Sequence, residues 1–470
     1  MTTETISILP HAAPDRSRFV AIFRSVQPVA LIFYLLAIPA VFLLSDQDSV
    51  VKIRWHDFIV PALVLPICYY LGLALCVRWF SFPQATRAYS LSFLVRAVVA
   101  FSSACFFQHA DEPTLHFSAI ERINRGLPWW QGNGYEVILA TIYRIFGENF
   151  LMPKVLAVTV FSFLPLILYR FAEGLFRNKS AATFALNAGI FLPPLVLYSA
   201  YSLKEMPCIF TTICALYVLM FTDRSILIRF FVAIAVVAFV AFLRGAWAII
   251  PGSIATFYLF LHAPGLLGRV TKRRFVFFAI TLVVTVVALA VSPVYDRVMG
   301  HLQSRIYVGS HASWGSFRIG SSGSITRSLL DSSDPWSIKN IIIQVLRAPF
   351  SPSPLSYVFR PSVVQFLDAL VSLTQYVLYP YAIIGALTYL RRRSVLIISA
   401  MQVIVTVVAG LSLLLGLNIS RHGMVQFPML TLLAAGGLRF RGRYKPLIFV
   451  WWFAVFIVNY FYVAFNLRQP

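Results

Sequence analysis

The sequence predicts an all-α polytopic integral membrane protein, with about thirteen transmembrane helices and two amphipathic surface helices. Its 470 residues are 59% hydrophobic and only 12% charged, whereas an average soluble domain carries about 25% charged residues. A soluble chain of this length would need more charged side chains to cover its surface. Disorder is excluded as well, because 15% of the residues are aromatic and the mean hydropathy is +0.79.

Apolar runs of about 20 residues, the length that crosses the hydrocarbon core of a membrane, divide the chain into spans and loops. The spans are predicted near residues 27–45, 59–77, 90–107, 152–171, 180–197, 206–221, 226–242, 246–262, 275–292, 363–390, 394–417, 422–438 and 446–464. The resulting order is a cytoplasmic leader, three spans, a first long outer loop, six spans, a second long outer loop and four spans. These parts cover residues 1–26, 27–107, 108–151, 152–292, 293–362 and 363–470, respectively.

The distribution of Lys and Arg predicts which side of the membrane each loop faces. With the N-terminus inside, every dense basic cluster, such as 269–274 or 391–393, lies in an inner loop, as the positive-inside rule requires. Both long loops then face outside. Topology and the attraction of anionic membrane lipids account for the net charge of +22, so nucleic acid is not expected as a partner.

Two short helices are predicted in the first outer loop. One runs from about Pro113 to Arg125, because proline favours the first helical position and Gly126 follows as a stop. The other runs from Tyr135 to Phe146 and is amphipathic. Their apolar sides indicate helices that lie on the membrane surface.

Asp111 and Glu112 lie where a span ends and the first of these helices begins. The positive end of the helix favours their ionised forms, so they could either cap the helix or take part in chemistry. Glu112 and His116 are spaced i, i+4, the spacing that places two metal ligands on one helical face, and a metal site is left open.

Several motifs in the first half of the chain occur in a recognisable order. Asp111-Glu112 follows a span and precedes the two surface helices, and Leu203-Lys204-Glu205 follows a Leu-Pro and a Tyr-Ser pair. Over residues 100–225 this order resembles the membrane glycosyltransferases of the GT-C superfamily. The resemblance is strongest to the bacterial family-39 type, which is related to protein mannosyltransferases and lipid A aminoarabinose transferases.

The resemblance implies an inverting transferase in the bacterial inner membrane, with its active site facing the periplasm. The donor would be a polyprenyl-phosphate-linked sugar, and the acceptor a lipid, glycan or protein. Asp111 would be the catalytic base, while Glu112 and Glu205 would position the acceptor or a divalent cation, Mg or Mn. No other cofactor is implied. Substrate binding is assigned to Lys204, Arg244, Arg421, His422 and His116.

Other interpretations of the same residues stay open. Glu205 could form a local ion pair with Lys204, and Arg244 could extend to lipid headgroups. The main alternative function is a polysaccharide repeat-unit polymerase or ligase, which acts on lipid-diphosphate-linked oligosaccharide through arginines of the second outer loop. A transporter is disfavoured, because transport sites gather at mid-membrane depth. Only Arg96, near the middle of a predicted span and without an identified acidic partner, favours that class.

Overall fold

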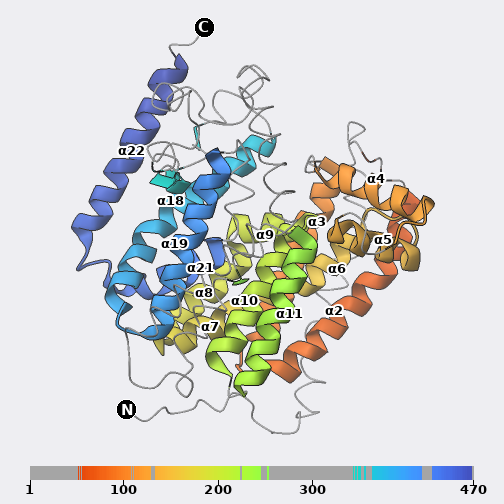
Figure 1. Cartoon of the computed structure of the whole chain (residues 1–470), viewed down its shortest axis with the longest axis horizontal. Coiled ribbons are helices and arrows are strands. Elements are labelled where there is room, and N and C mark those ends of the chain that lie inside the picture. The colour runs from red at the N-terminus through yellow and green to blue at the C-terminus, as the bar shows by residue number, and fades with distance from the viewer. Residues whose placement is uncertain are drawn as a thin grey trace, which may run out of the picture. The chain divides into compact units, whose positions relative to one another are not determined.

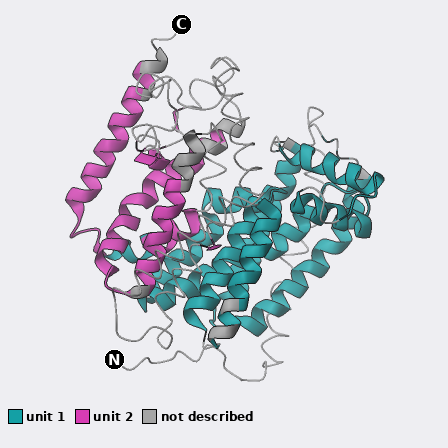
Figure 2. Cartoon of the chain, in the orientation of Figure 1, with its two compact units in different colours: residues 1–248, 434–439 teal, residues 249–433, 440–470 magenta. Residues whose placement is uncertain are grey.

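The structure of the protein is a computed structural model. It describes residues 51, 53, 55–106, 108, 111–128, 133–222, 225–244, 251–252, 342, 345–346, 348–350, 354–355, 363–414 and 426–467. Every element formed by these residues is a helix, which confirms the all-α class for this part of the chain. The chain divides into two compact units, shown in Figure 2. The first unit comprises Met1–Ala248 with Ala434–Arg439, and the second comprises Ile249–Leu433 with Phe440–Pro470.

The first unit is built from helices, most of which Figure 1 labels. Two of them are short and amphipathic. The described helices are η1 (Trp55–Phe58), α2 (Ile59–Trp79), α3 (Ala85–Phe106), α4 (Asp111–Asn124), α5 (Gly134–Phe146), α6 (Met152–Phe161), α7 (Leu164–Phe176), α8 (Lys179–Phe191), α9 (Pro193–Ala200), α10 (Glu205–Phe221) and α11 (Ile226–Arg244). The helices α4 and α5 lie in the ranges where the sequence predicts two short helices, and they pack against each other. That they lie on a membrane surface stays a prediction.

Four helical stretches within the described residues are long and apolar enough to cross a membrane. They are His56–Trp79, Ala85–Cys105, Met152–Phe176 and Ala369–Tyr389. The pair α8 and α9 passes the same test as one span that is bent by 44°. These helices support a membrane protein, whereas the predicted number of spans stays a prediction. The predicted spans near 27–45, 246–262 and 275–292 lie wholly or mostly outside the described residues.

Local sequence signals explain the close pairing of α7 with α8. Arg177 ends α7 with φ = 49°, in the left-handed region, and the chain then reverses. The side chain of Asn178 caps α8 by accepting hydrogen bonds from the backbone amides of Ser180 and Ala181 at 2.8 and 3.3 Å. Further along, a Cβ atom on Gly189 would lie 2.7 Å from the Cα atom of Pro165, so only glycine permits this approach.

The second unit contains η4 (Ala348–Phe350), α18 (Val363–Tyr389), α19 (Arg393–Leu414), most of α21 (Gln426–Gly437), the last residue of η6 (Leu438–Phe440) and α22 (Lys445–Leu467). Hydrogen bonds join these elements. The Tyr376 hydroxyl donates to the Phe350 carbonyl at 2.7 Å, and Trp451 Nε1 donates to the Tyr376 carbonyl at 2.9 Å. Tyr379 likewise donates to Gln426 Oε1 at 2.8 Å. Large apolar side chains of α22 such as Phe449 remain exposed, as expected of a helix that faces lipid.

Candidate functional site

The acidic pair Asp111 and Glu112 forms the first turn of α4. The helix begins two residues before the predicted start at Pro113, so both carboxylates belong to the helix and do not precede it. Asp111 is half-buried, whereas Glu112 is only 1% exposed. Adjacent carboxylates in such different surroundings are suited to different roles. At the other end of the helix, Gly126 adopts φ = 62°, which matches its predicted role as the stop.

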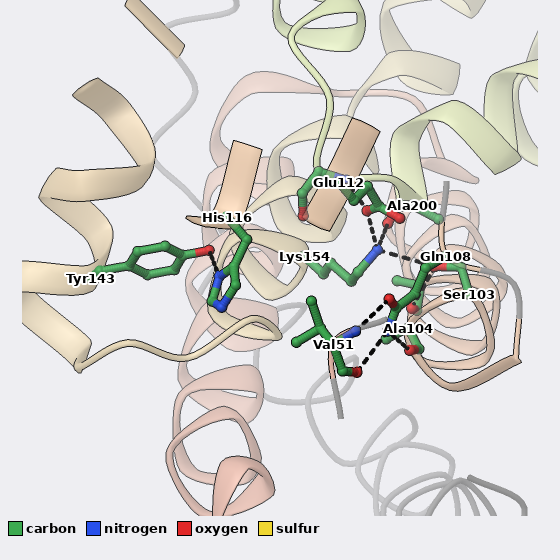
Figure 3. Close-up of polar contacts among 11 residues, drawn as sticks. Val51, Ser103, Ala104, Gln108, Glu112, His116, Tyr143, Lys154 and Ala200 are labelled. Carbon is green, nitrogen blue, oxygen red and sulfur yellow. Dashed lines mark hydrogen bonds and ion pairs between the residues drawn. The ribbon is translucent and has the colours of Figure 1, made fainter. Parts of the chain in front are cut away.

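The Glu112 carboxylate is held by groups from other helices. Its Oε1 atom forms an ion pair with Lys154 Nζ of α6 and accepts a hydrogen bond from the backbone amide of Ser202 at 2.6 Å. Lys154 Nζ also donates to Ser103 Oγ of α3 at 3.2 Å and to the Ala200 carbonyl, at the end of α9, at 3.4 Å (Figure 3). Four separate segments of the first unit therefore meet at one carboxylate–ammonium pair.

Lys154 is a site residue that the sequence analysis missed. Its signal is a single lysine, directly after Pro153, in the first turn of an otherwise apolar span. The side chain is 1% exposed, and its ammonium lies 5.3 Å from the ring centroid of Phe150 and 5.8 Å from that of Tyr201. A cation in these surroundings requires a paired anion, because desolvation of a lone charge costs several kcal/mol.

His116 lies one helical turn after Glu112 but makes contacts in another direction. Its Nδ1 atom is 2.7 Å from the Tyr143 hydroxyl of α5 (Figure 3). The imidazole ring also packs edge-on against the ring of Phe150. Burial lowers the pKa of His116 to about 4, although the Asp57 carboxylate acts in the opposite direction. The imidazole is therefore neutral at pH 7. Its contacts join α4 to α5, and its role in substrate binding stays a prediction.

The metal site left open by the Glu112 and His116 spacing gains no support from this geometry. Figure 3 shows Glu112 directed toward Lys154 and His116 directed toward Tyr143. A cation at Glu112 would compete with the Lys154 ammonium. Within the described part of the chain, no three His, Cys, Asp or Glu side chains are grouped as metal ligands. A requirement for Mg or Mn remains an untested prediction.

A second buried ion pair joins α10 to α11. Glu205, the first residue of α10, pairs with Arg244, the last residue of α11, and their side chains are 0% and 16% exposed. The sequence left a local pair of Glu205 with Lys204 open. The structure instead gives Glu205 a partner 39 positions later in the chain. Arg244 is thus held in place at the end of α11 by the Glu205 carboxylate.

Lys204 precedes α10 and is half-buried. Burial lowers its pKa, and the Arg244 cation lowers it further, while the carboxylates of Glu205 and Glu136 act in the opposite direction. Lys204 therefore lies in the field of one neighbouring cation and two neighbouring carboxylates.

The two buried ion pairs belong to one polar region of the first unit. Ser202, which donates to Glu112, is only three residues from Glu205, which binds Arg244. Tyr135 of α5 connects the same groups: it is buried, and its pKa is raised well above 10 by burial first and then by the Glu112, Tyr143 and Glu205 side chains. Tyr135 is consequently a neutral hydroxyl near both carboxylates.

The structure thus brings most of the predicted site residues into the first unit. Glu112 shares a polar region with Lys204, Glu205 and Arg244, and Asp111 adjoins it at the start of α4. Arg421 and His422 lie outside the described residues, as does almost all of the second predicted outer loop. Comparison of the chain with protein-family models, curated proteins and solved structures gave no match.

Proposed function

We propose that the protein is a membrane glycosyltransferase that moves a sugar from a polyprenyl-phosphate-linked donor to a lipid, glycan or protein acceptor on the outer face of a bacterial inner membrane. The observation that carries this proposal is the division of the acidic pair. Glu112 is buried and neutralised by Lys154, while the adjacent Asp111 is half-buried at the start of the same helix. Anchoring Glu112 fixes the backbone that presents Asp111.

Asp111 acts in this proposal as the general base. It accepts the proton of the acceptor hydroxyl while that oxygen attacks C1 of the sugar from the face opposite the phosphate. The bond from C1 to the phosphate oxygen breaks, the configuration at C1 inverts, and polyprenyl phosphate leaves as the anion. Atoms and charge balance without any further reactant.

Lys204 and Arg244 stabilise the leaving phosphate. Lys204 directly precedes α10 and Arg244 ends α11, and cations at the site of a developing negative charge stabilise the transition state. Glu205 holds Arg244 in a fixed orientation, so the guanidinium group does not need to reorient when negative charge develops on the phosphate. Arg421 and His422 keep their predicted roles in substrate binding as part of this proposal.

The direct test supplies purified protein in lipid nanodiscs with radiolabelled sugars on short-chain polyprenyl phosphate. We expect release of polyprenyl phosphate that depends on the protein, and no consumption of nucleotide sugars. Arg244→Ala should lower transfer at least 10-fold, with Arg229→Ala, an arginine at the opposite end of α11, as the matched control. Turnover of nucleotide sugars but not of lipid-linked sugars would contradict the proposal.

The repeat-unit polymerase or ligase remains the alternative. It would use a lipid-diphosphate-linked oligosaccharide and depend on Arg318 and Arg327, which lie outside the described residues. A polymerase would make product chains longer than one added sugar. The polymerase is favoured if Arg318→Ala abolishes these chains while Arg244→Ala retains them.

A further inference from the structure

Arg96 lies in the middle of α3, and its side chain is 0% exposed. A charged group at this depth of a predicted span is costly unless other groups bind it. No acid among the described residues does so. Nη1 donates to Ser92 Oγ at 2.5 Å, and Nη2 donates to the backbone carbonyl oxygen of Gly189 at 2.8 Å. The second contact reaches from α3 to α8, 93 positions along the chain.

The Gly189 carbonyl needs a donor because of Pro193. In a continuous α-helix, the carbonyl of residue 189 accepts a hydrogen bond from the amide of residue 193. Proline has no amide hydrogen. The last bond of this series in α8 joins the Leu192 amide to the Ala188 carbonyl at 2.8 Å. At the next position the helix breaks, and α9 continues at an angle of 44°.

We propose that Arg96 is a positioning residue, which supplies the hydrogen bond that Pro193 removes and thereby holds α9 at its angle to α8. The helix α3 packs against both α8 and α9, so the guanidinium lies at the side of the break. Without this donor, the buried carbonyl would lack a partner, and the bend could relax toward other angles.

The end of α9 leads directly to the candidate site. The carbonyl of Ala200, its last residue, accepts a hydrogen bond from Lys154, and Ser202 donates its amide to Glu112. A change in the angle at Pro193 would therefore move the segment that binds the Glu112–Lys154 pair. The consequence for sugar transfer rests on the proposed function, whereas the role of Arg96 at the helix break does not.

The first test is a double-mutant cycle read by thermal unfolding of the full-length protein. Arg96→Gln should lower the unfolding temperature by about 5 °C, because a buried carbonyl loses its donor. Adding Pro193→Ala should restore much of this loss, since alanine provides the missing amide. The matched control is Pro194→Ala, whose amide would serve the Ile190 carbonyl, which Arg96 does not contact. The proposal would be overturned if Pro193→Ala and Pro194→Ala changed the unfolding temperature of the Arg96→Gln protein equally, or if neither changed it.

The second test separates positioning from general stabilisation. A cysteine at position 202, in a chain whose five native cysteines are replaced, should react slowly with N-ethylmaleimide, because Ser202 is buried. Arg96→Gln should increase this rate at least about 10-fold. Trp451→Phe, which removes a hydrogen bond in the second unit, serves as a destabilising control and should leave the rate unchanged. An unchanged rate in Arg96→Gln, or equal increases in both variants, would contradict the positioning role.

Discussion

Lys154 and Glu112 form an ion pair in which neither side chain is more than 1% exposed, between the first turn of α6 and the first turn of α4. The pair fixes a short amphipathic helix to the apolar helices beside it. The two adjacent carboxylates therefore differ in their surroundings: Glu112 is buried and paired with Lys154, whereas Asp111 is half-buried.

Removing one member of this pair should cost more than removing both. Lys154→Met leaves a buried carboxylate and should destabilise the protein by about 3–5 kcal/mol. The double variant Lys154→Met/Glu112→Gln lacks the unpaired charge and should be more stable than Lys154→Met alone. Thermal unfolding in detergent measures both. If the stability losses of the two single substitutions simply add in the double variant, the two residues do not interact.

His116 should make stability depend on pH between about 6.5 and 4. The folded protein keeps His116 neutral down to pH 4, whereas the unfolded chain binds a proton below its ordinary pKa near 6.5. The unfolded state therefore binds more protons in this window, and stability falls as pH falls. His116→Gln should be less stable at pH 7 and show a shallower decline. Identical pH profiles for the two proteins would contradict the buried, neutral imidazole.

Gly134 should not tolerate a larger side chain. A Cβ atom at this position would lie 2.3 Å from the backbone carbonyl oxygen of Phe242, where α5 begins against α11. Gly134→Ala should therefore cost about 1–3 kcal/mol through forced displacement of the backbone. Gly442→Ala is the control, because nothing lies within 4 Å of a Cβ atom there. Equal unfolding temperatures for both variants would argue against this packing.

The orientation of the chain can be tested by cysteine labelling in intact cells. Thr114 is exposed on α4, and Arg392 is exposed in the basic turn between α18 and α19. A membrane-impermeant maleimide should label Thr114→Cys but not Arg392→Cys, because basic turns face the cytoplasm. Labelling of Arg392→Cys without cell lysis would reverse the predicted orientation.

Sequence patterns predicted the helices better than the contacts among them. Apolar runs located α2, α3, α18 and α22 to within a few residues of their ends, since burial in lipid or protein dominates such segments. The breaks after Phe161 and Phe191 were not predicted. Proline is tolerated within membrane helices when other groups satisfy the freed carbonyls, so its presence alone does not locate a break.

The candidate site was predictable only in part, because local sequence patterns do not show contacts between residues that are distant in the chain. Asp111, Glu112 and Glu205 were evident as acids at helix ends, because short-range sequence context identifies such positions. Their partners were not. Lys154 is 42 positions from Glu112, and Arg244 is 39 positions from Glu205. Pairs that form through tertiary packing leave no local pattern, and the role of Arg96 at a carbonyl of α8 could not be inferred from charge alone.

The central claim is that Asp111 is the catalytic base, and Asp111→Asn tests it most directly. The substitution keeps the size of the side chain and removes its basicity, so transfer from polyprenyl-phosphate-linked sugar should fall at least about 100-fold while the unfolding temperature stays unchanged. Glu121→Gln is the matched control, because Glu121 is an exposed carboxylate on the same helix. The account predicts near-normal transfer for Glu121→Gln and almost none for Asp111→Asn. Near-normal transfer by stably folded Asp111→Asn protein would contradict it.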